Sequence, residues 1–284
     1  MAGLLDGLEG LGLGKLENVD IFEEEKKETV AREGAKMVAP KTITEEEIIY
    51  DKEFECPICN RKFMSKVMKT GKTKMIAQDD DMRPKYEGID ANKYDVVLCP
   101  HCGYAAIARY FGPLLPAQTK LIKENICASI KLNKYNDPVY GYDQAFERIK
   151  IALACAVVKK SKISEKSFIC LKTAWLLRGK REMLEAEGHL PQDVKETLEN
   201  QEKEYLKNAY TGFLDARGKE NPPIAGMDTN TLDYLLAQLA YKTGDYDTAS
   251  RLVAGLLSTR GNDRLKNKVL DLKELVKAAK GKAE

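Results

Sequence analysis

Cys56-Pro57-Ile58-Cys59 and Cys99-Pro100-His101-Cys102 share one pattern, and these two motifs decide the fold of the chain. Within each motif, the two intervening residues allow both sulfurs to turn toward one metal ion. The residue after each motif is Asn60 or Gly103, and these two types accept the positive φ of a metal-binding knuckle. Together the motifs predict one tetrahedral metal site with four thiolate ligands, Cys56, Cys59, Cys99 and Cys102.

Two metals suit such a site. We expect one Zn2+ ion, because four thiolates beside a scaffold-like domain suit a structural metal. Iron is the alternative, since rubredoxins hold iron between two such knuckles and Cys99-Pro100-His101-Cys102-Gly103 resembles the second of theirs. The ligands alone do not separate the two metals.

Other uses of these cysteines fit the sequence less well. A thioredoxin-type redox pair needs a strand-to-helix junction, and no such pattern surrounds Cys56. A disulfide framework is not expected, because the chain has seven cysteines and no secretory signal. We expect Cys127, Cys155 and Cys170 to be small buried hydrophobic residues.

Composition places the chain among soluble proteins of one or two domains. Of its 284 residues, 43% are hydrophobic and 32% are charged, with a net charge of +2. No apolar run reaches the length of a membrane span. We therefore expect a cytoplasmic location and no membrane insertion. No catalytic set stands out, and His189 has no evident nucleophilic partner, so we expect no enzymatic activity.

The first 48 residues differ from the rest in charge and composition. Residues 1–55 carry 15 acidic and 7 basic side chains, whereas the whole chain is nearly neutral. Five glycines among the first 14 residues oppose a stable helix. We predict a disordered or loosely helical leader over residues 1–48.

The sequence predicts a zinc-ribbon domain over residues 49–112. Strand-like runs are expected over residues 63–68, 73–77 and 94–98, the last leading directly into the second knuckle. The interpretation is two knuckles joined by one small antiparallel sheet. So little apolar area is available that a metal must supply much of the stability of this domain.

A basic stretch within this domain has two interpretations. Residues 61–74 hold six lysine or arginine side chains and no acid. They could form a nucleic-acid patch. They could also be the solvated face of a hairpin, where lysines discourage edge pairing. The nearly neutral charge of the chain favours the solvated face.

Residues 113–284 have the apolar periodicity of a helical domain. Helices are expected over residues 121–130, 145–158, 164–179, 191–217, 228–243, 246–258 and 263–280. Leu236-Ala237, Gly244, Tyr246 and Ala249 match part of the tetratricopeptide repeat pattern. The predicted fold class is α+β, mainly α: a small four-cysteine zinc ribbon followed by a tetratricopeptide-like helical domain.

The whole arrangement resembles a known family, the bacterial proteins grouped as domain of unknown function 2225. The strongest stretch of the resemblance is residues 94–105, from Tyr94 through the second knuckle to Ala105. The first knuckle, residues 79–90 and the Gly244-Asp245-Tyr246 turn also match. The resemblance implies a cytosolic metal-binding protein with tetratricopeptide-like helices, and it implies no activity.

From these features we expect a non-enzymatic zinc-binding adaptor or scaffold. Helical repeats build surfaces that hold peptides or helices, so the partner is expected to be another protein bound by the helical domain. Two alternatives stay open, a rubredoxin-like iron redox protein and a zinc-ribbon nucleic-acid binder.

Overall fold

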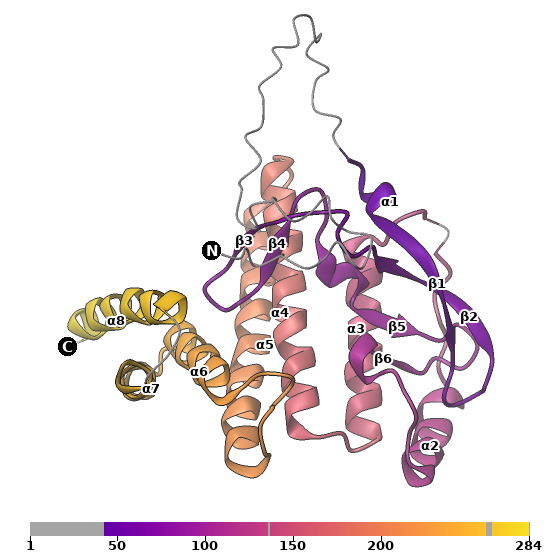
Figure 1. Ribbon diagram of the computed structural model, residues 1–284. Helices are drawn as coiled ribbons and strands as arrows, with labels where there is room; N and C mark the ends of the chain where they lie inside the picture. The colour runs from indigo at the N-terminus through magenta and orange to yellow at the C-terminus, as the bar shows by residue number, and fades with distance from the viewer. Residues whose placement is uncertain (1–42, 136, 260–262, 284) are drawn as a thin grey trace, which may run out of the picture. The chain divides into compact units, whose positions relative to one another are not determined.

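A computed structural model describes residues 43–135, 137–259 and 263–283 of the chain. Short antiparallel strands carry the four motif cysteines, and long helices follow them (Figure 1). This confirms the predicted class, α+β and mainly α. Most of the predicted leader lies outside the described residues; its described end forms the short helix α1, Glu45–Ile48. Among the described residues, no helix combines the length and apolar character needed to span a membrane.

Three separate two-stranded antiparallel sheets make up the β part. The pairs are β1 (Ile49–Glu55) with β2 (Lys62–Met68), β3 (Met75–Gln78) with β4 (Pro84–Tyr86), and β5 (Val96–Leu98) with β6 (Ala105–Ile107). The expectation of one sheet joining the knuckles is therefore wrong. Each knuckle is instead the turn of its own hairpin, and a third hairpin lies in the connection between them.

The strand prediction over residues 94–98 was also too long. Tyr94 ends a 3-10 helix, Ala91–Tyr94, whose start is capped by the Asp90 side chain accepting from the Asn92 amide at 3.0 Å. Only Val96–Leu98 is extended. Local capping at Asp90 thus competes with the β-propensity of the apolar run that follows it.

In the described part of the chain, seven longer helices follow α1, and the first of them continues into a five-residue π-helix, Lys123–Cys127. They are α2 (Pro116–Ile122), α3 (Tyr142–Val158), α4 (Ile163–Ala186), α5 (Gln192–Lys219), α6 (Thr229–Thr243), α7 (Tyr246–Ser258) and α8 (Asp263–Ala283). Helix α4 continues past Gly179, where a stop was expected. A Cβ at Gly179 would lie 2.2 Å from Asp90 Oδ2, so this glycine permits a close approach to the ribbon.

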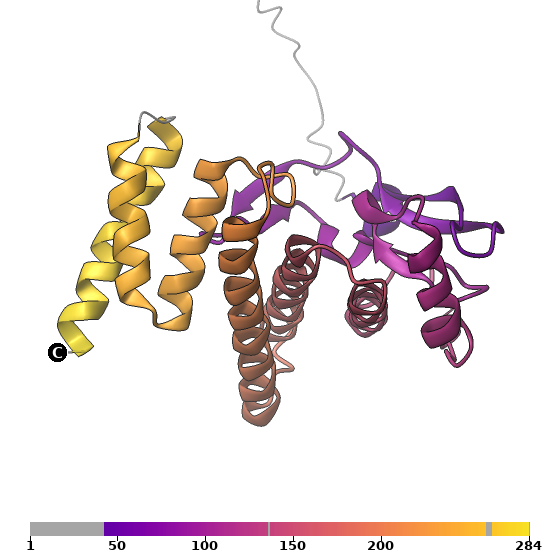
Figure 2. The ribbon, with the colours of Figure 1, turned by 90° about the horizontal axis from the view of Figure 1, so that it is seen from below.

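From α4 onward, each helix packs against the next one in the chain (Figure 2). Gly244 ends α6 with φ +85°, and the Asp245 side chain caps α7 by accepting from the Thr248 amide at 3.1 Å. Asp228, the first residue of the helix predicted over residues 228–243, caps α6 in the same way. Trp175, Phe213 and Leu236 lie in the shared apolar core of α4, α5 and α6.

A buried ionic cluster fastens the third hairpin to the long helices. Asp79 and Asp81 lie in its turn, and both accept hydrogen bonds from Arg178 of α4. Arg178 also donates from Nε to Glu202 of α5 at 2.7 Å. The cluster therefore joins one ribbon turn to two helices, which sets where the ribbon lies on the helical part.

Candidate metal centre

The four motif cysteines lie together at the facing tips of two hairpins. Cys56 and Cys59 lie in the β1–β2 turn, and Cys99 and Cys102 lie in the β5–β6 turn. All four sulfurs lie within 4.8 Å of one another. The structure thus brings together the complete set of ligands that the two motifs predicted, across an interval of about forty residues.

The two knuckles have nearly the same backbone. In the first, the Asn60 amide donates to the Cys56 carbonyl at 2.9 Å, and in the second the Gly103 amide donates to the Cys99 carbonyl at 2.9 Å. Asn60 has φ +57° and Gly103 has φ +76°. These are the left-handed positions expected from the sequence, where Gly is unstrained and Asn is tolerated.

Two of the four cysteines lie in an apolar environment that excludes solvent. Cys56 and Cys99 are completely buried, while Cys59 and Cys102 are half-buried. Phe63, Tyr104 and Ile122 are among the buried side chains that pack around the two buried sulfurs. On the side of these two cysteines, apolar side chains would therefore shield a bound ion from solvent.

The pKa values of Cys56, Cys99 and Cys102 lie above the ordinary value of a thiol, whereas the pKa of Cys59 lies below it. Contact with the Cys102 thiol raises the pKa of Cys99 to about 11, against an opposing effect of Cys56, and burial raises it further. Burial alone would also raise the pKa of Cys59, but backbone donors led by Arg61 lower it. A divalent cation reverses this balance, because it stabilises thiolates and displaces their protons. The crowding of four sulfurs is therefore consistent with a metal site.

The donor set is complete without any further group. Four protein ligands fill a tetrahedral shell, so no position is left for a water or a substrate. His101 lies in the second knuckle but is exposed, and it does not join the cluster. Such a closed site is typical of structural metals, and four thiolates accept either zinc or iron.

Cys127, Cys155, Cys170 and His189 are not members of this ligand set, although Cys127 and Cys155 pack beside it. Cys155 and Cys170 are buried, and Cys127 is half-buried in the π-helix beside the knuckles. His189 is exposed in the turn after α4. The sequence did not reveal that residues 79–84 take part in the ionic cluster. The signal available was the acidic run before Arg83, which is unusual for a freely solvated turn.

The basic stretch lies opposite acidic side chains. Lys62 pairs with Glu53 at 2.9 Å and Lys66 pairs with Asp51 at 3.2 Å, both across the β1–β2 hairpin. Lys69 donates to the Glu47 carbonyl at 2.9 Å. Half of the basic side chains of residues 61–74 therefore already have acceptors within the chain.

One family model matches the chain, described as an uncharacterized protein conserved in bacteria, DUF2225, over residues 49–278. No curated protein and no solved structure matches it. The family match begins at β1 and ends within α8, so it includes both knuckles and the helices that follow. It confirms the family resemblance drawn from the sequence.

Proposed function

The chain belongs to the DUF2225 family of bacterial proteins, and we propose that it is a zinc-stabilised, non-enzymatic adaptor for another protein. The observation that carries this proposal is the closed four-sulfur cluster, in which protein atoms occupy every position of a tetrahedral shell. A metal in such a shell holds two hairpins together and has no site for a reacting group. Thiols kept for metal binding also suit a reducing cytoplasm, so a cytoplasmic location is part of the proposal.

Zinc is favoured over iron by what surrounds the cluster. The ribbon is fastened to long helices by a buried ionic cluster, which suits a structural role better than electron transfer. Elemental analysis of anaerobically purified full-length protein tests this directly. We expect one zinc per chain and a colourless protein; iron as the main metal, with a red colour lost on reduction, would support the rubredoxin-like alternative.

The adaptor role is supported by the serial packing of α4 to α8. Helices that each pack on the next one are typical of repeat domains, whose extended surfaces bind peptides or helices. Leu270 and Leu275 of α8 are each more than two-fifths exposed, although Leu272 of the same helix is fully buried. These two leucines, on different sides of α8, are the apolar contacts that we expect a partner to use.

Variants of α8 test the adaptor role. Full-length protein should recover a defined protein from its native cells in a stoichiometric amount that the double variant Leu270→Ser/Leu275→Ser does not recover. Glu274→Ser is the matched control, since Glu274 is exposed on the same helix and its loss removes no apolar surface. Equal recovery by all three proteins, or no stoichiometric partner, would count against the helical surface as the binding site.

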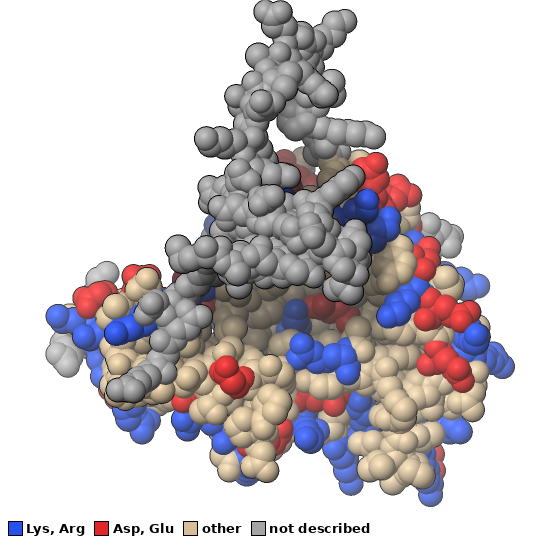
Figure 3. Space-filling model, viewed as in Figure 1, with Lys and Arg blue, Asp and Glu red and all other residues tan. Residues whose placement is uncertain are grey.

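Nucleic-acid binding is the less supported alternative. The cross-strand pairs of Lys62 and Lys66 neutralise part of the basic stretch. Acidic and basic side chains are interspersed on the face drawn in Figure 3. A phosphate-binding surface would show affinity for DNA or RNA that falls steeply with salt. Tight, salt-steep binding that is lost when Lys66, Lys69, Lys72 and Lys74 are changed to Glu would support this alternative over the adaptor role.

A further inference from the structure

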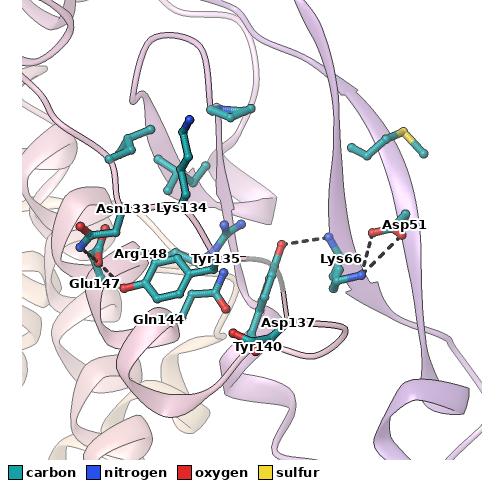
Figure 4. Close-up of a pocket in the computed structure, with 14 residues that line it drawn as sticks. Asp51, Lys66, Asn133, Lys134, Tyr135, Asp137, Tyr140, Gln144, Glu147 and Arg148 are labelled. Atoms are coloured by element: carbon teal, nitrogen blue, oxygen red, sulfur yellow. Dashed lines mark hydrogen bonds and ion pairs between the residues drawn. The ribbon is translucent and has the colours of Figure 1, made fainter.

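A cavity of about 460 Å³ lies beside the second knuckle, between the β1–β2 hairpin and α3 (Figure 4). Its walls come from the hairpin, the second knuckle with the end of β5, residues 132–135 and 137–140, and the first turns of α3. Its volume falls in the range of small-molecule sites. Pro100 of the second knuckle forms part of the wall, so the cavity adjoins the candidate metal centre.

The guanidinium of Arg148 is the most unusual group in this wall. Only 8% of the residue is exposed, and its charged group lies 4.4 Å from the ring centre of Tyr140. Both of its hydrogen bonds use Nη2, which donates to the Ser65 hydroxyl at 3.1 Å and to the Val96 carbonyl at 2.9 Å. Nε is buried and has no acceptor among the described residues. Of the five N–H donors of this guanidinium, the two on Nη1 make no hydrogen bond to the described residues and remain available to a ligand.

Arg148 has no directly bonded carboxylate among the described residues, and the nearby charge of Glu147 offsets the effect of burial only in part. Among the described residues, no ion pair joins Arg148 to an acid, although Glu147 is the next residue in the chain. Glu147 Oε2 instead accepts from the Tyr135 hydroxyl and from the Asn133 amide at 2.7 Å. Water in the cavity cannot supply the missing negative charge. A buried cation without a partner is unfavourable, and a bound carboxylate would relieve that cost.

The rest of the wall argues against a highly charged anion. Arg148, Lys66 and Lys134 are balanced by Asp51, Asp137 and Glu147, so the lining has no net charge. The oxygen Oε1 of Gln144 is buried and has no hydrogen-bond partner among the described residues, and the carboxylate of Glu147 lies in the same wall, so the wall offers an acceptor as well as donors. Figure 4 shows Gln144, Tyr135 and Arg148 on the α3 side of the cavity, across from Lys66 and Asp51. A ligand that carries both a carboxylate and an ammonium group matches this lining better than a phosphate does.

We propose that this cavity binds a small zwitterion of the amino-acid or dipeptide class, with its carboxylate on Arg148 and its ammonium group near Glu147 and Gln144. The guanidinium supplies donors of the geometry that carboxylates prefer. The ring of Tyr135, which is 39% exposed, lies where it can cover the side chain of the ligand. The adaptor would then have a small-molecule site next to its metal centre, at a junction of ribbon and helices.

Calorimetric titration of the metal-loaded full-length protein tests this proposal. The panel contains the twenty amino acids, representative dipeptides, propionate, ethylamine and inorganic phosphate. We expect at least one amino acid or dipeptide to bind. The same compound with its carboxylate converted to an amide should bind at least roughly tenfold more weakly, because the buried cation then lacks its partner. Comparing single amino acids with dipeptides distinguishes the two sources of the zwitterion.

Three variants locate the site. Arg148→Lys keeps the positive charge but loses the planar pair of N–H donors, and it should weaken binding by roughly tenfold or more. Since Arg148 also holds Ser65 and Val96, Glu147→Gln and Gln144→Leu provide changes that leave those contacts in place. Arg251→Lys, on the exposed surface of α7, is the matched control and should bind normally. The Nε–H resonance of Arg148 should shift on titration.

Several outcomes would overturn the proposal. One is that no member of the panel binds. A second is that phosphate binds more tightly than every zwitterion, which would make the cavity a simple anion site. A third is that the affinity is unchanged in both Glu147→Gln and Gln144→Leu, which would place the ligand elsewhere. None of these results bears on metal content or on partner recovery by α8, so the adaptor proposal is tested separately.

Discussion

Arg178 of α4 donates from two guanidinium nitrogens to the two carboxylate oxygens of Asp81, which lies 97 residues earlier in the chain. Asp81 is completely buried and Arg178 is 7% exposed. The pair therefore exists only in the folded protein, where it joins the turn of the β3–β4 hairpin to α4. A buried pair of this kind is a weak source of net stability, but removing one partner leaves an uncompensated charge.

Asp81→Asn should destabilise the protein by about 1.5–3 kcal/mol, because charge-assisted hydrogen bonds are lost while Asp79 and Glu202 still pair with Arg178. The measurement is the free energy of unfolding from urea titration of the metal-loaded protein. Asp80→Asn is the matched control, because Asp80 is the neighbouring residue and is exposed. It should change stability by less than about 0.5 kcal/mol. Equal effects of the two variants would show that the pair does not hold the ribbon turn in place.

The same pair predicts a pH dependence. Burial opposes ionisation of Asp81, but the hydrogen bonds and charge of Arg178 outweigh it and hold the pKa of this carboxyl below its usual value. A carboxyl with a folded-state pKa below its unfolded value stabilises the fold above about pH 4, and this contribution is lost as pH falls through the folded-state pKa. The wild-type protein should thus lose more stability below pH 4 than Asp81→Asn does.

Urea titrations of both proteins between pH 6 and pH 2.5 measure this difference. Metal release at low pH affects both proteins alike, so it cancels in the comparison. Asp79, whose pKa is also lowered, against the effect of burial, by Arg83 and then Arg178, contributes to the loss in both. Parallel stability curves for the two proteins would contradict the assigned role of Asp81.

Cys99→Ser should abolish stoichiometric metal binding. Three remaining thiolates cannot complete the shell, and structural zinc contributes on the order of 10 kcal/mol to a small site. The ribbon should then become sensitive to protease within residues 49–112, while most of the helical signal in circular dichroism remains. The readouts are metal per chain and the mapped cleavage sites.

Cys170→Ser is the matched control for this substitution. Cys170 is also buried, but it packs in the helical core with Trp175 and Phe213, away from the knuckles. It should retain one metal per chain. Full metal content in Cys99→Ser, or metal loss in Cys170→Ser, would disprove the assignment of the four ligands.

Replacing Gly244 or Gly255 by alanine should change the stability of the protein in opposite directions. Gly244 has φ +85° at the end of α6, and an added methyl would meet open space. Gly244→Ala should therefore cost about 1–2 kcal/mol from backbone conformation alone. Gly255 lies within α7, also with open space around it, so Gly255→Ala should stabilise the protein by about 0.5–1 kcal/mol. Thermal unfolding distinguishes the signs, and two changes of the same sign would contradict the left-handed turn at Gly244.

The sequence by itself determined the features that depend on local spacing. Two residues between paired cysteines, with Asn60 or Gly103 after them, predicted both knuckles and their left-handed turns. Apolar periodicity predicted the helices from α3 to α8, and Asp228 predicted the start of α6, because a cap acts within one turn. These are short-range interactions, so the residues that decide them are neighbours in the chain.

Tertiary structure alone decided how distant segments combine. Nothing local in Asp81 indicates Arg178 as its partner, and nothing local in Gly179 indicates the close approach of Asp90 that keeps α4 continuous. The division of the β part into three hairpins depends in the same way on which strands meet. The cavity beside Arg148 exists because α3, the second knuckle and the β1–β2 hairpin come together around a buried cation that forms no ion pair with the described residues. Such contacts are set by packing across the whole fold, since their free energy depends on burial and distance and not on separation along the chain.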